Sequence, residues 1–122
     1  MAEHYDFGKE AEQLAVQFLE KKKYKILERN YRFQKAEIDI IAHDLVKNEI
    51  VIVEVKARKY NSLQKPEEAV TKSKQKLLLK ATDAFLINRN LNLETRFDII
   101  SIEKSVSNWT IRHIENAFYS FE

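Results

Sequence analysis

Three side chains with acid–base or metal-binding chemistry lie inside two short apolar segments of the chain. Asp39 belongs to the run EIDIIA at 37–42, and Glu54 and Lys56 belong to the run IVIVEVK at 50–56. Charges seldom occupy such runs unless a partner or a metal compensates them. Successive side chains of a strand point to opposite faces, so Glu54 and Lys56 share one face. If the two segments pair as a hairpin, we expect all three groups at one end of one sheet face.

Strict alternation divides the two segments into a charged face and an apolar face. On the first segment it places Asp39 on the same face as Glu37 and Ile41, which makes Glu37 a weaker candidate for a supporting acid. The polar connection at 44–48 supplies the hairpin turn. The predicted apolar face consists of Ile38, Ile40, Val51, Val53 and Val55.

Two carboxylates and an ammonium around one point suit phosphodiester hydrolysis. Mg²⁺ and Mn²⁺ prefer hard carboxylate oxygens, keep several water ligands and accept phosphate oxygens. Such a metal lowers the pKa of a bound water and neutralises charge on the phosphorane oxygens. Lys56 would orient or deprotonate the attacking water, or stabilise the transition state. The residues alone leave an alternative open, because a structural ion pair on a half-exposed sheet face uses the same side chains.

The spacing D-(x)n-E-x-K, with Asp39 fifteen residues before Glu54, resembles the core of the restriction-endonuclease-like nucleases. E-x-K alone occurs often by chance, so further motifs carry the specificity. They are GKEAEQLA at 8–15, NYR at 30–32, AEIDIIA at 36–42, VEVKAR at 53–58, AVTKSK at 69–74, RFD at 96–98 and HIENAF at 113–118. In this order and over nearly the whole chain, they resemble the YraN family of small bacterial proteins, which is similar in fold to archaeal Holliday-junction resolvases.

This resemblance implies an α/β fold with a restriction-endonuclease-like core, in which helices flank a central mixed β-sheet. It implies Mg²⁺ or Mn²⁺ held by Asp39, Glu54 and the backbone carbonyl of Val55. Lys56 would act on the water, and Glu12 would support the metal or its water, as in resolvase-like nucleases. The implied substrate is DNA, branched or otherwise structured, and the implied assembly is a homodimer because related resolvases act as dimers.

Two positions depart from the family pattern. Where the family usually has glycine before a glutamate, in the first helix and in the first charged strand, this chain has Ala11 and Ala36. Alanine keeps the small size of glycine without its freedom to adopt positive φ. The backbone at both positions must therefore be reachable by an L-residue.

Hydrophobic periodicity predicts the order α-β-β-β-α-β-β in a single domain spanning 1–122. The expected elements are a helix at about 6–22, a strand at 24–33, the two charged strands ending at about 57, a helix with Pro66 in its first turn, and strands at 97–102 and 109–114. A polar connection at 58–64 would precede the second helix. We expect the RFD motif to be structural, with Phe97 in the core and its two charged neighbours paired locally.

Composition is typical of a compact globular protein rather than a disordered one, because 44% of residues are hydrophobic and 33% are charged. The N-terminal segment has neither the basic nor the apolar part of a signal peptide, and no apolar run is long enough for a bilayer. These features predict no membrane partner. With no cysteine, disulfides and thiolate metal sites are excluded, which fits a cytoplasmic location.

A net charge of only +2 means that nucleic-acid binding must rely on local basic patches. The candidates are basic residues next to the E-x-K strand or on the second helix: Arg58, Lys59, Lys72, Lys74 and Lys76. Lysines recur at 72, 76 and 80 and form one helical stripe, a pattern that is also typical of a solvated helix face. Lys74 lies off this stripe, matches the family's helix lysine and would point toward the site.

Two functions of other classes remain compatible with the residues. A non-catalytic nucleic-acid-binding module would keep the nuclease fold and its charges without cleaving its ligand. A protein-interaction adaptor would show no salt-dependent binding of DNA at all. The intact carboxylates and lysine favour the nuclease over the non-catalytic binding module.

Overall fold

A computed structural model describes residues 7–59 and 70–118 of the chain, and its elements follow the predicted order. The bounds are α1 Phe7–Lys21, β1 Tyr24–Phe33, β2 Ala36–Asp44, β3 Glu49–Lys59, α2 Lys72–Arg89, β4 Thr95–Lys104 and β5 Trp109–Phe118. The strands form one five-stranded sheet in the order β1-β2-β3-β4-β5. β3 and β4 are parallel and the other neighbours antiparallel, so the sheet is mixed. This confirms the predicted α/β class and nuclease-like architecture.

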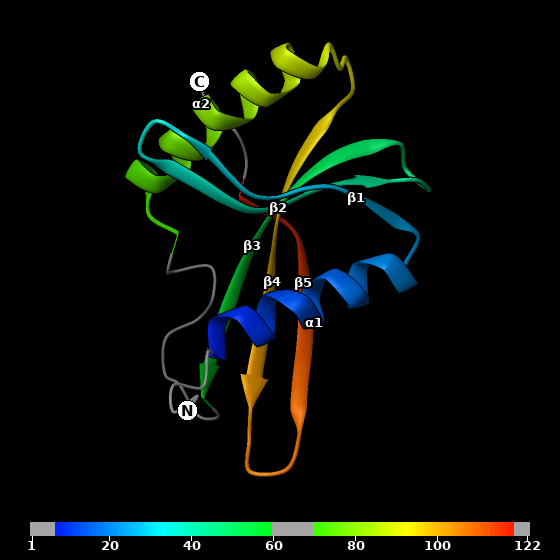
Figure 1. The fold of residues 1–122 in the computed structure, drawn as a ribbon, viewed down its shortest axis with the longest axis vertical. Coiled ribbons are helices and arrows are strands. Elements are labelled where there is room, and N and C mark those ends of the chain that lie inside the picture. Colours follow the sequence, from blue (N-terminus) through cyan, green and yellow to red (C-terminus); the bar gives the residue numbers. More distant parts are fainter. Residues whose placement is uncertain (1–6, 60–69, 119–122) are drawn as a thin grey trace, which may run out of the picture.

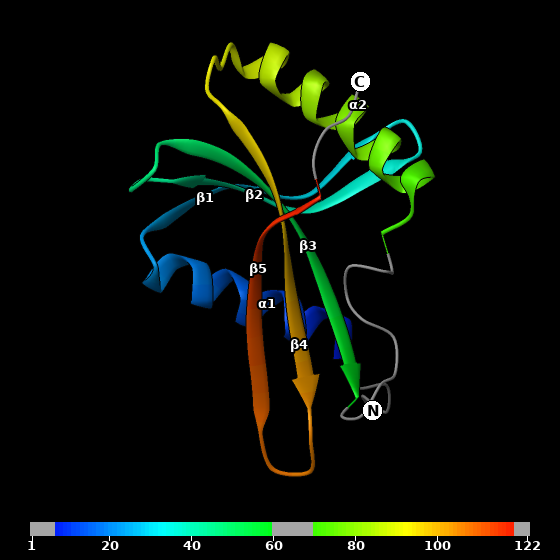
Figure 2. The same ribbon diagram turned by 180° about the vertical axis from the view of Figure 1, so that it is seen from behind.

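The two helices cover opposite faces of the sheet. α1 crosses in front of β3, β4 and β5 in Figure 1 and lies behind them in Figure 2. Its buried residues Ala15 and Leu19 pack with Val51 and Val53 of β3. α2, which connects the parallel strands β3 and β4, buries Phe85 and neighbouring apolar residues on the other face. The charged side chains of α1 and those of α2 therefore approach the same strands from opposite sides.

β3 alternates between these two faces along its length. Val51 and Val53 face α1, whereas Ile50 and Ile52 belong to the core under α2. Continuing this alternation places Glu54 on the α2 face. This confirms the prediction that Glu54 shares one face of β3 with Ile50 and Ile52.

β2 does not follow the predicted alternation. Its pairing with β3 ends at Ile40, opposite Val53, and the β1–β2 hairpin then turns away from the lower part of β3 (Figure 1). Ile40 packs on the α1 side as predicted, but Ile38 belongs to the core under α2. The prediction for Ile38 was wrong because it assumed that β2 stays paired with β3, and the strand instead leaves its neighbour at Asp39.

Two predicted boundaries also need correction. α2 begins at Lys72, and the side chain of its N-cap residue Thr71 accepts a hydrogen bond from the backbone N–H of Lys74. The predicted start of the helix, with Pro66 in its first turn, lies outside the described residues. β3 continues to Lys59, opposite β4, so Arg58 is part of the strand rather than of the following connection.

The alanines that replace the family's glycines sit in ordinary backbone. Residues with positive φ in the described part of the chain are Lys23, Asn30, Gln34, Asn48, Asn90 and Asn116. Ala11 is fully buried in α1 and Ala36 is buried at the start of β2. A small side chain is therefore what both positions require.

Within the ranges 7–59 and 70–118, neither helix has the length and apolar character needed to span a bilayer. α2 is the longer of the two, with 18 residues, and it carries four lysines.

Candidate functional site

The site begins where β2 and β3 separate. Beyond the last ladder pair, the Asp39 carboxylate takes the place of a strand carbonyl and accepts a hydrogen bond from the Val55 N–H at 2.8 Å. Glu54, the residue before Val55, is only 2% exposed and lies beside Asp39. The parting of the strands therefore holds two carboxylates in contact.

Burial raises the pKa of Asp39 to about 8, and the charge and hydrogen bond of Glu54 act in the same direction. The Val55 N–H opposes this shift, whereas the more remote charge of Glu12 adds to it. A negative charge beside a buried carboxyl group disfavours its ionised form. In the metal-free protein the Asp39 carboxyl group is therefore mostly protonated at neutral pH.

Two lysines flank the carboxylate pair on the α2 face. Lys74 extends from the first turn of α2 and places Nζ 2.7 Å from Glu54 Oε2. Burial would lower the pKa of Lys74, but the close, charged carboxylate of Glu54 outweighs this effect and raises that pKa. Burial and the nearby Lys74 charge lower the pKa of Lys56. The two ammonium groups thus compete for one pair of acids.

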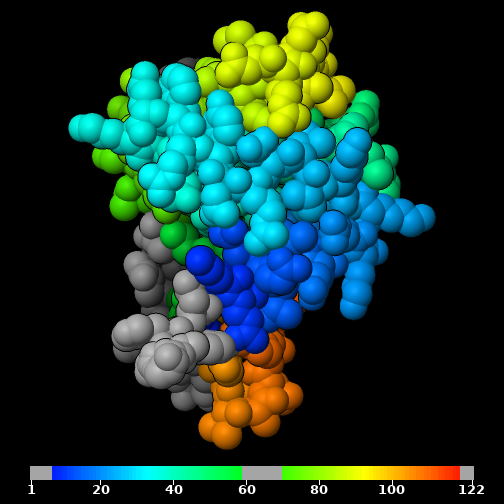
Figure 3. All heavy atoms as spheres, viewed as in Figure 1, coloured from blue at the N-terminus to red at the C-terminus, as the bar shows by residue number. Residues whose placement is uncertain are grey.

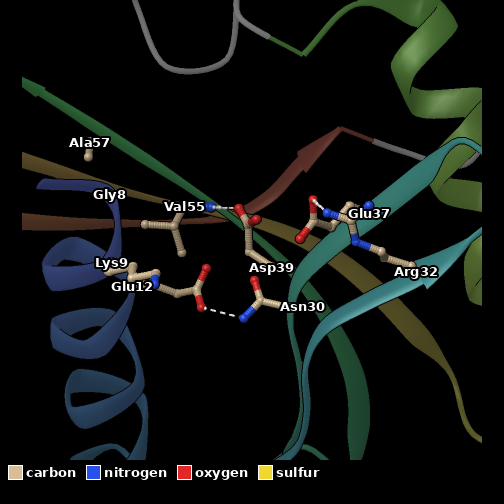
Figure 4. A pocket seen from close by; sticks show the side chains of 9 residues that line it. All are labelled: Gly8, Lys9, Glu12, Asn30, Arg32, Glu37, Asp39, Val55 and Ala57. Atoms are coloured by element: carbon tan, nitrogen blue, oxygen red, sulfur yellow. Dashed lines mark hydrogen bonds and ion pairs between the residues drawn. The ribbon is translucent and has the colours of Figure 1, made fainter. Parts of the chain in front are cut away.

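Glu12 approaches from the α1 side and points toward Asp39 across an open hollow (Figure 4). Asn30 Nδ2 donates a hydrogen bond to Glu12 Oε1 at 3.0 Å, and Arg29 lies 3.4 Å from the same oxygen. Asn30 has φ 53°, a left-handed conformation that asparagine tolerates better than most residues. The irregular backbone of β1 thus aims an amide at Glu12 and fixes the direction of its carboxylate.

The hollow has a volume of about 530 Å³ and is lined by one glycine and polar residues of α1, β1 and β2, together with two apolar residues of β3. Figure 3 shows the N-terminal part of α1 in dark blue meeting the β1–β2 hairpin in cyan on this side of the molecule. The lining residues are Gly8, Lys9, Glu12, Asn30, Arg32, Glu37, Asp39, Val55 and Ala57. Such an opening gives solvent and an extended ligand access to Asp39.

The sequence-predicted catalytic residues Asp39, Glu54 and Lys56 come together at this point, and Glu12 faces them from α1. Glu37 is a rim residue, since its side chain is 42% exposed and pairs with Arg32 at 3.5 Å. The RFD motif has the expected structural place, with a buried core phenylalanine between paired charges.

The predicted phosphate-binding residues separate into two groups. Lys74 is part of the site itself, whereas Lys72 and Lys76 are exposed on α2. Arg58 follows Lys56 on β3 and lies 3.8 Å from Glu103. The backbone of Lys59 pairs with β4.

Sequence reasoning missed the support that Glu12 receives. Nothing in the sequence pointed to Arg29, and the NYR motif assigned Asn30 no contact with Glu12. The available signal was the asparagine itself inside a predicted strand, since asparagine is unfavourable there unless it adopts a special conformation.

The donor set suits a metal that retains water rather than a closed protein cage. Among residues 7–59 and 70–118, no three Asp, Glu, His or Cys side chains are arranged to hold a metal ion. The pair Asp39 and Glu54 supplies two carboxylates, and Mg²⁺ commonly binds through one or two carboxylates with waters and substrate phosphates. Glu54 Oε2 is buried and, in the described part of the chain, receives no well-directed hydrogen bond despite the close Lys74 ammonium. An under-satisfied carboxylate oxygen of this kind fits a cation ligand.

Replacing Asp39 with asparagine is expected to change how stability depends on pH. The folded wild type keeps the Asp39 proton up to about pH 8, whereas the unfolded chain loses it near pH 4, so wild-type stability falls as pH rises across this window. At about pH 9, without metal, we expect Asp39→Asn to be more stable by about 3 kcal/mol, roughly half of what the full shift would give because Asp39 is partly exposed.

Urea unfolding of both proteins at about pH 5 and about pH 9 in EDTA measures this difference. The exposed Asp83 offers a control, and Asp83→Asn should leave the wild-type pH dependence unchanged. Parallel pH profiles for wild type and Asp39→Asn would contradict the prediction.

The fold and the site together define an α/β protein of restriction-endonuclease-like architecture, with an acid pair and a lysine where two central strands part. The sequence profile of the uncharacterised protein family UPF0102 matches residues 11–102, and the chain belongs to this family, which confirms the YraN resemblance.

Similar proteins of this family extend over nearly the whole chain. UPF0102 protein FP2501 of Flavobacterium psychrophilum is 50% identical over 99% of this chain and 100% of its own length. A UPF0102 protein of Phocaeicola vulgatus is 44% identical over 98% of this chain and 97% of its own length. A UPF0102 protein of Geobacter metallireducens is 46% identical over 91% of this chain and 90% of its own length.

Proposed function

We propose that this protein is a divalent-metal-dependent nuclease that hydrolyses phosphodiester bonds in DNA. The observation that carries the proposal is the contact between the carboxylates of Asp39 and Glu54, beside Lys56 and open to the Glu12 hollow. Perturbed acids around a cleft are characteristic of catalytic sites. A purely structural ion pair would not need a second carboxylate that raises the pKa of Asp39.

In this proposal Asp39 and Glu54 hold Mg²⁺ or Mn²⁺, with the Val55 carbonyl as a further ligand. The metal supplies charge neutralisation at the phosphate and a more acidic bound water. Metal binding requires Asp39 to lose its proton, so metal affinity rises with pH up to about 8. Glu12, held by Asn30, supports the metal or its water from the opposite wall of the hollow.

Lys56 orients the attacking water or takes its proton. The lowered pKa of its ammonium increases the neutral fraction that can act as a base. The water oxygen forms a bond to phosphorus, its proton passes to Lys56 Nζ, and the bond from phosphorus to the leaving sugar oxygen breaks. That oxygen takes a proton from solvent.

DNA rather than a small phosphodiester fits the open shape of the hollow and the basic side chains at its rim, Lys9 and Arg32. Branched or otherwise structured DNA and a homodimer follow from the likeness to Holliday-junction resolvases. A second copy would extend the small DNA surface that a chain of 122 residues can cover.

Cleavage of linear, single-stranded, flapped and four-way-junction DNA, with Mg²⁺, Mn²⁺ or EDTA, tests the proposal. We expect product only with metal, and preferred cleavage of one structure. Thermal unfolding in the same buffers should show metal stabilisation of the wild type that Asp39→Ala lacks. No product from any substrate, and no metal stabilisation, would refute a metal-dependent nuclease.

A non-catalytic nucleic-acid-binding module is the second candidate. The ion pair between Lys74 and Glu54 favours it, because this contact neutralises an acid of the site without any metal. This candidate predicts salt-dependent DNA binding that is retained in Glu54→Ala, with no cleavage by either protein.

A further inference from the structure

Lys74 contacts the buried carboxylate oxygen of Glu54 that would have to bind a metal. Its Nζ is 2.7 Å from Glu54 Oε2, and the Glu54 side chain is 3% exposed. The contact is close but is not directed as a hydrogen bond, since Oε2 lacks a hydrogen-bond partner of good geometry among the described residues. It is therefore an ion pair held chiefly by charge.

With a divalent metal bound, the site would carry more positive charge than its carboxylates balance. Lys56 and Lys74 both lie beside the acid pair, close enough for their ammonium charges to repel each other. A divalent cation at Glu54 would add two further charges within a partly buried space, where such repulsion is several times stronger than in water. One ammonium must then move away, and Lys74 is the one that sits on Glu54 Oε2.

Lys74 has room to move and a second acid within its surroundings. A hollow of about 320 Å³ adjoins it on the α2 side, lined by Lys35, Ala36, Glu37, Lys74, Leu77 and Leu78. Glu37 also lines the larger hollow at Asp39, so it stands between the two spaces. Glu37 pairs with Arg32 at 3.5 Å, and both side chains are exposed. An exposed ion pair is weak, so the Lys74 ammonium could compete with Arg32 for Glu37.

We propose that Lys74 is a displaceable internal counter-ion, which neutralises Glu54 in the metal-free protein and is exchanged for the divalent metal when the site loads. This inference rests on the proposed function. It adds that the ion pair between Lys74 and Glu54 limits the affinity of the site for metal. Lys74 keeps the acid pair satisfied without metal, and metal binding must overcome that ion pair. The exchange frees an ammonium at the edge of the site, where an incoming phosphate can pair with it.

Calorimetric titration of the DNA-free protein with Mn²⁺ tests this exchange. Lys74→Met, which keeps the length of the stem but removes the charge, should bind Mn²⁺ about tenfold more tightly than the wild type. Lys74→Arg should bind like the wild type, because it retains a competing cation. The matched control Lys72→Met removes an exposed lysine from the same helix turn and should leave the affinity unchanged.

Thermal unfolding gives a second readout that does not depend on cleavage. Without metal, Lys74→Met leaves Glu54 unpaired and should unfold at a lower temperature than the wild type, and saturating Mn²⁺ should raise its midpoint by more than it raises the wild-type midpoint. If Lys74→Met does not fold, Lys74→Gln carries the same expectations.

Equal Mn²⁺ affinity in the wild type and in the uncharged Lys74 variant would overturn the counter-ion role while leaving the proposed nuclease intact. Equal tightening by Lys74→Met and Lys72→Met would also overturn it, because the effect would then reflect overall charge. No Mn²⁺ binding by any of these proteins would refute the metal site itself, and with it both proposals.

Discussion

Glu54→Gln is expected to lower metal-dependent DNA cleavage by about 10³-fold. Glutamine keeps the shape of the side chain but removes the charge that a metal needs, and it offers an amide where a ligand oxygen stood. Because Glu54 is almost fully buried, no neighbouring carboxylate can easily replace it. Single-turnover cleavage of the preferred DNA at saturating enzyme isolates this loss from any change in DNA affinity.

Glu28→Gln is the matched control for this variant. Glu28 lies on β1, is partly exposed and pairs with Arg89 of α2, away from the acid pair. We expect its cleavage rate to stay within about twofold of the wild type, as is usual for surface substitutions. A Glu54→Gln protein that cleaves at the wild-type rate would place the chemistry elsewhere.

Arg96→Met is expected to destabilise the fold by about 3 to 5 kcal/mol. The Arg96 side chain is 3% exposed and donates hydrogen bonds to Asp98 at 2.9 Å and to Tyr24 Oη at 2.6 Å. It also contacts Asp44 at 3.2 Å and Glu49 at 2.7 Å. Without the guanidinium, buried carboxylates on two strands lose their compensating charge.

The size and pH dependence of this loss can be measured by urea unfolding. Hydrogen bonds from His113 and Arg96 outweigh the effect of burial and hold the pKa of Asp98 below its usual range, so Asp98 stays ionised in the wild type. The deficit of Arg96→Met should shrink as the pH falls and these acids take up protons. Arg112→Met removes an exposed arginine from β5 and serves as the control. A deficit no larger than that of Arg112→Met would contradict the network's role.

Local patterns predicted most of the fold. Apolar periodicity located α1, and the alternation along β3 correctly placed Glu54 on the face of Ile50 and Ile52. The predicted start of α2 was wrong because this stretch contains two competing signals for the start of a helix. A proline suits a first helical turn, but the Thr71 side chain caps the helix five residues later.

The geometry of the candidate site depends on contacts that a one-dimensional pattern does not contain. Asp39 could be identified by spacing, but its direction is set by the Val55 N–H across the gap between two strands. Lys74 matched a motif, yet its contact with Glu54 arises only because α2 packs over β3. Likewise, the local pairing of Arg96 with Asp98 was predictable, whereas its bond to Tyr24 joins residues 72 positions apart.

The early end of the β2–β3 ladder has a consequence for attempts to make this protein more robust. A variant in which β2 continued to pair with β3 beyond Ile40 would gain backbone hydrogen bonds, and the Val55 N–H would then bind a carbonyl instead of the Asp39 carboxylate. The acid pair would be lost in exchange for a more regular sheet. Stabilising designs should therefore leave this gap open and strengthen the opposite end of the sheet, where Arg96 already joins the strands.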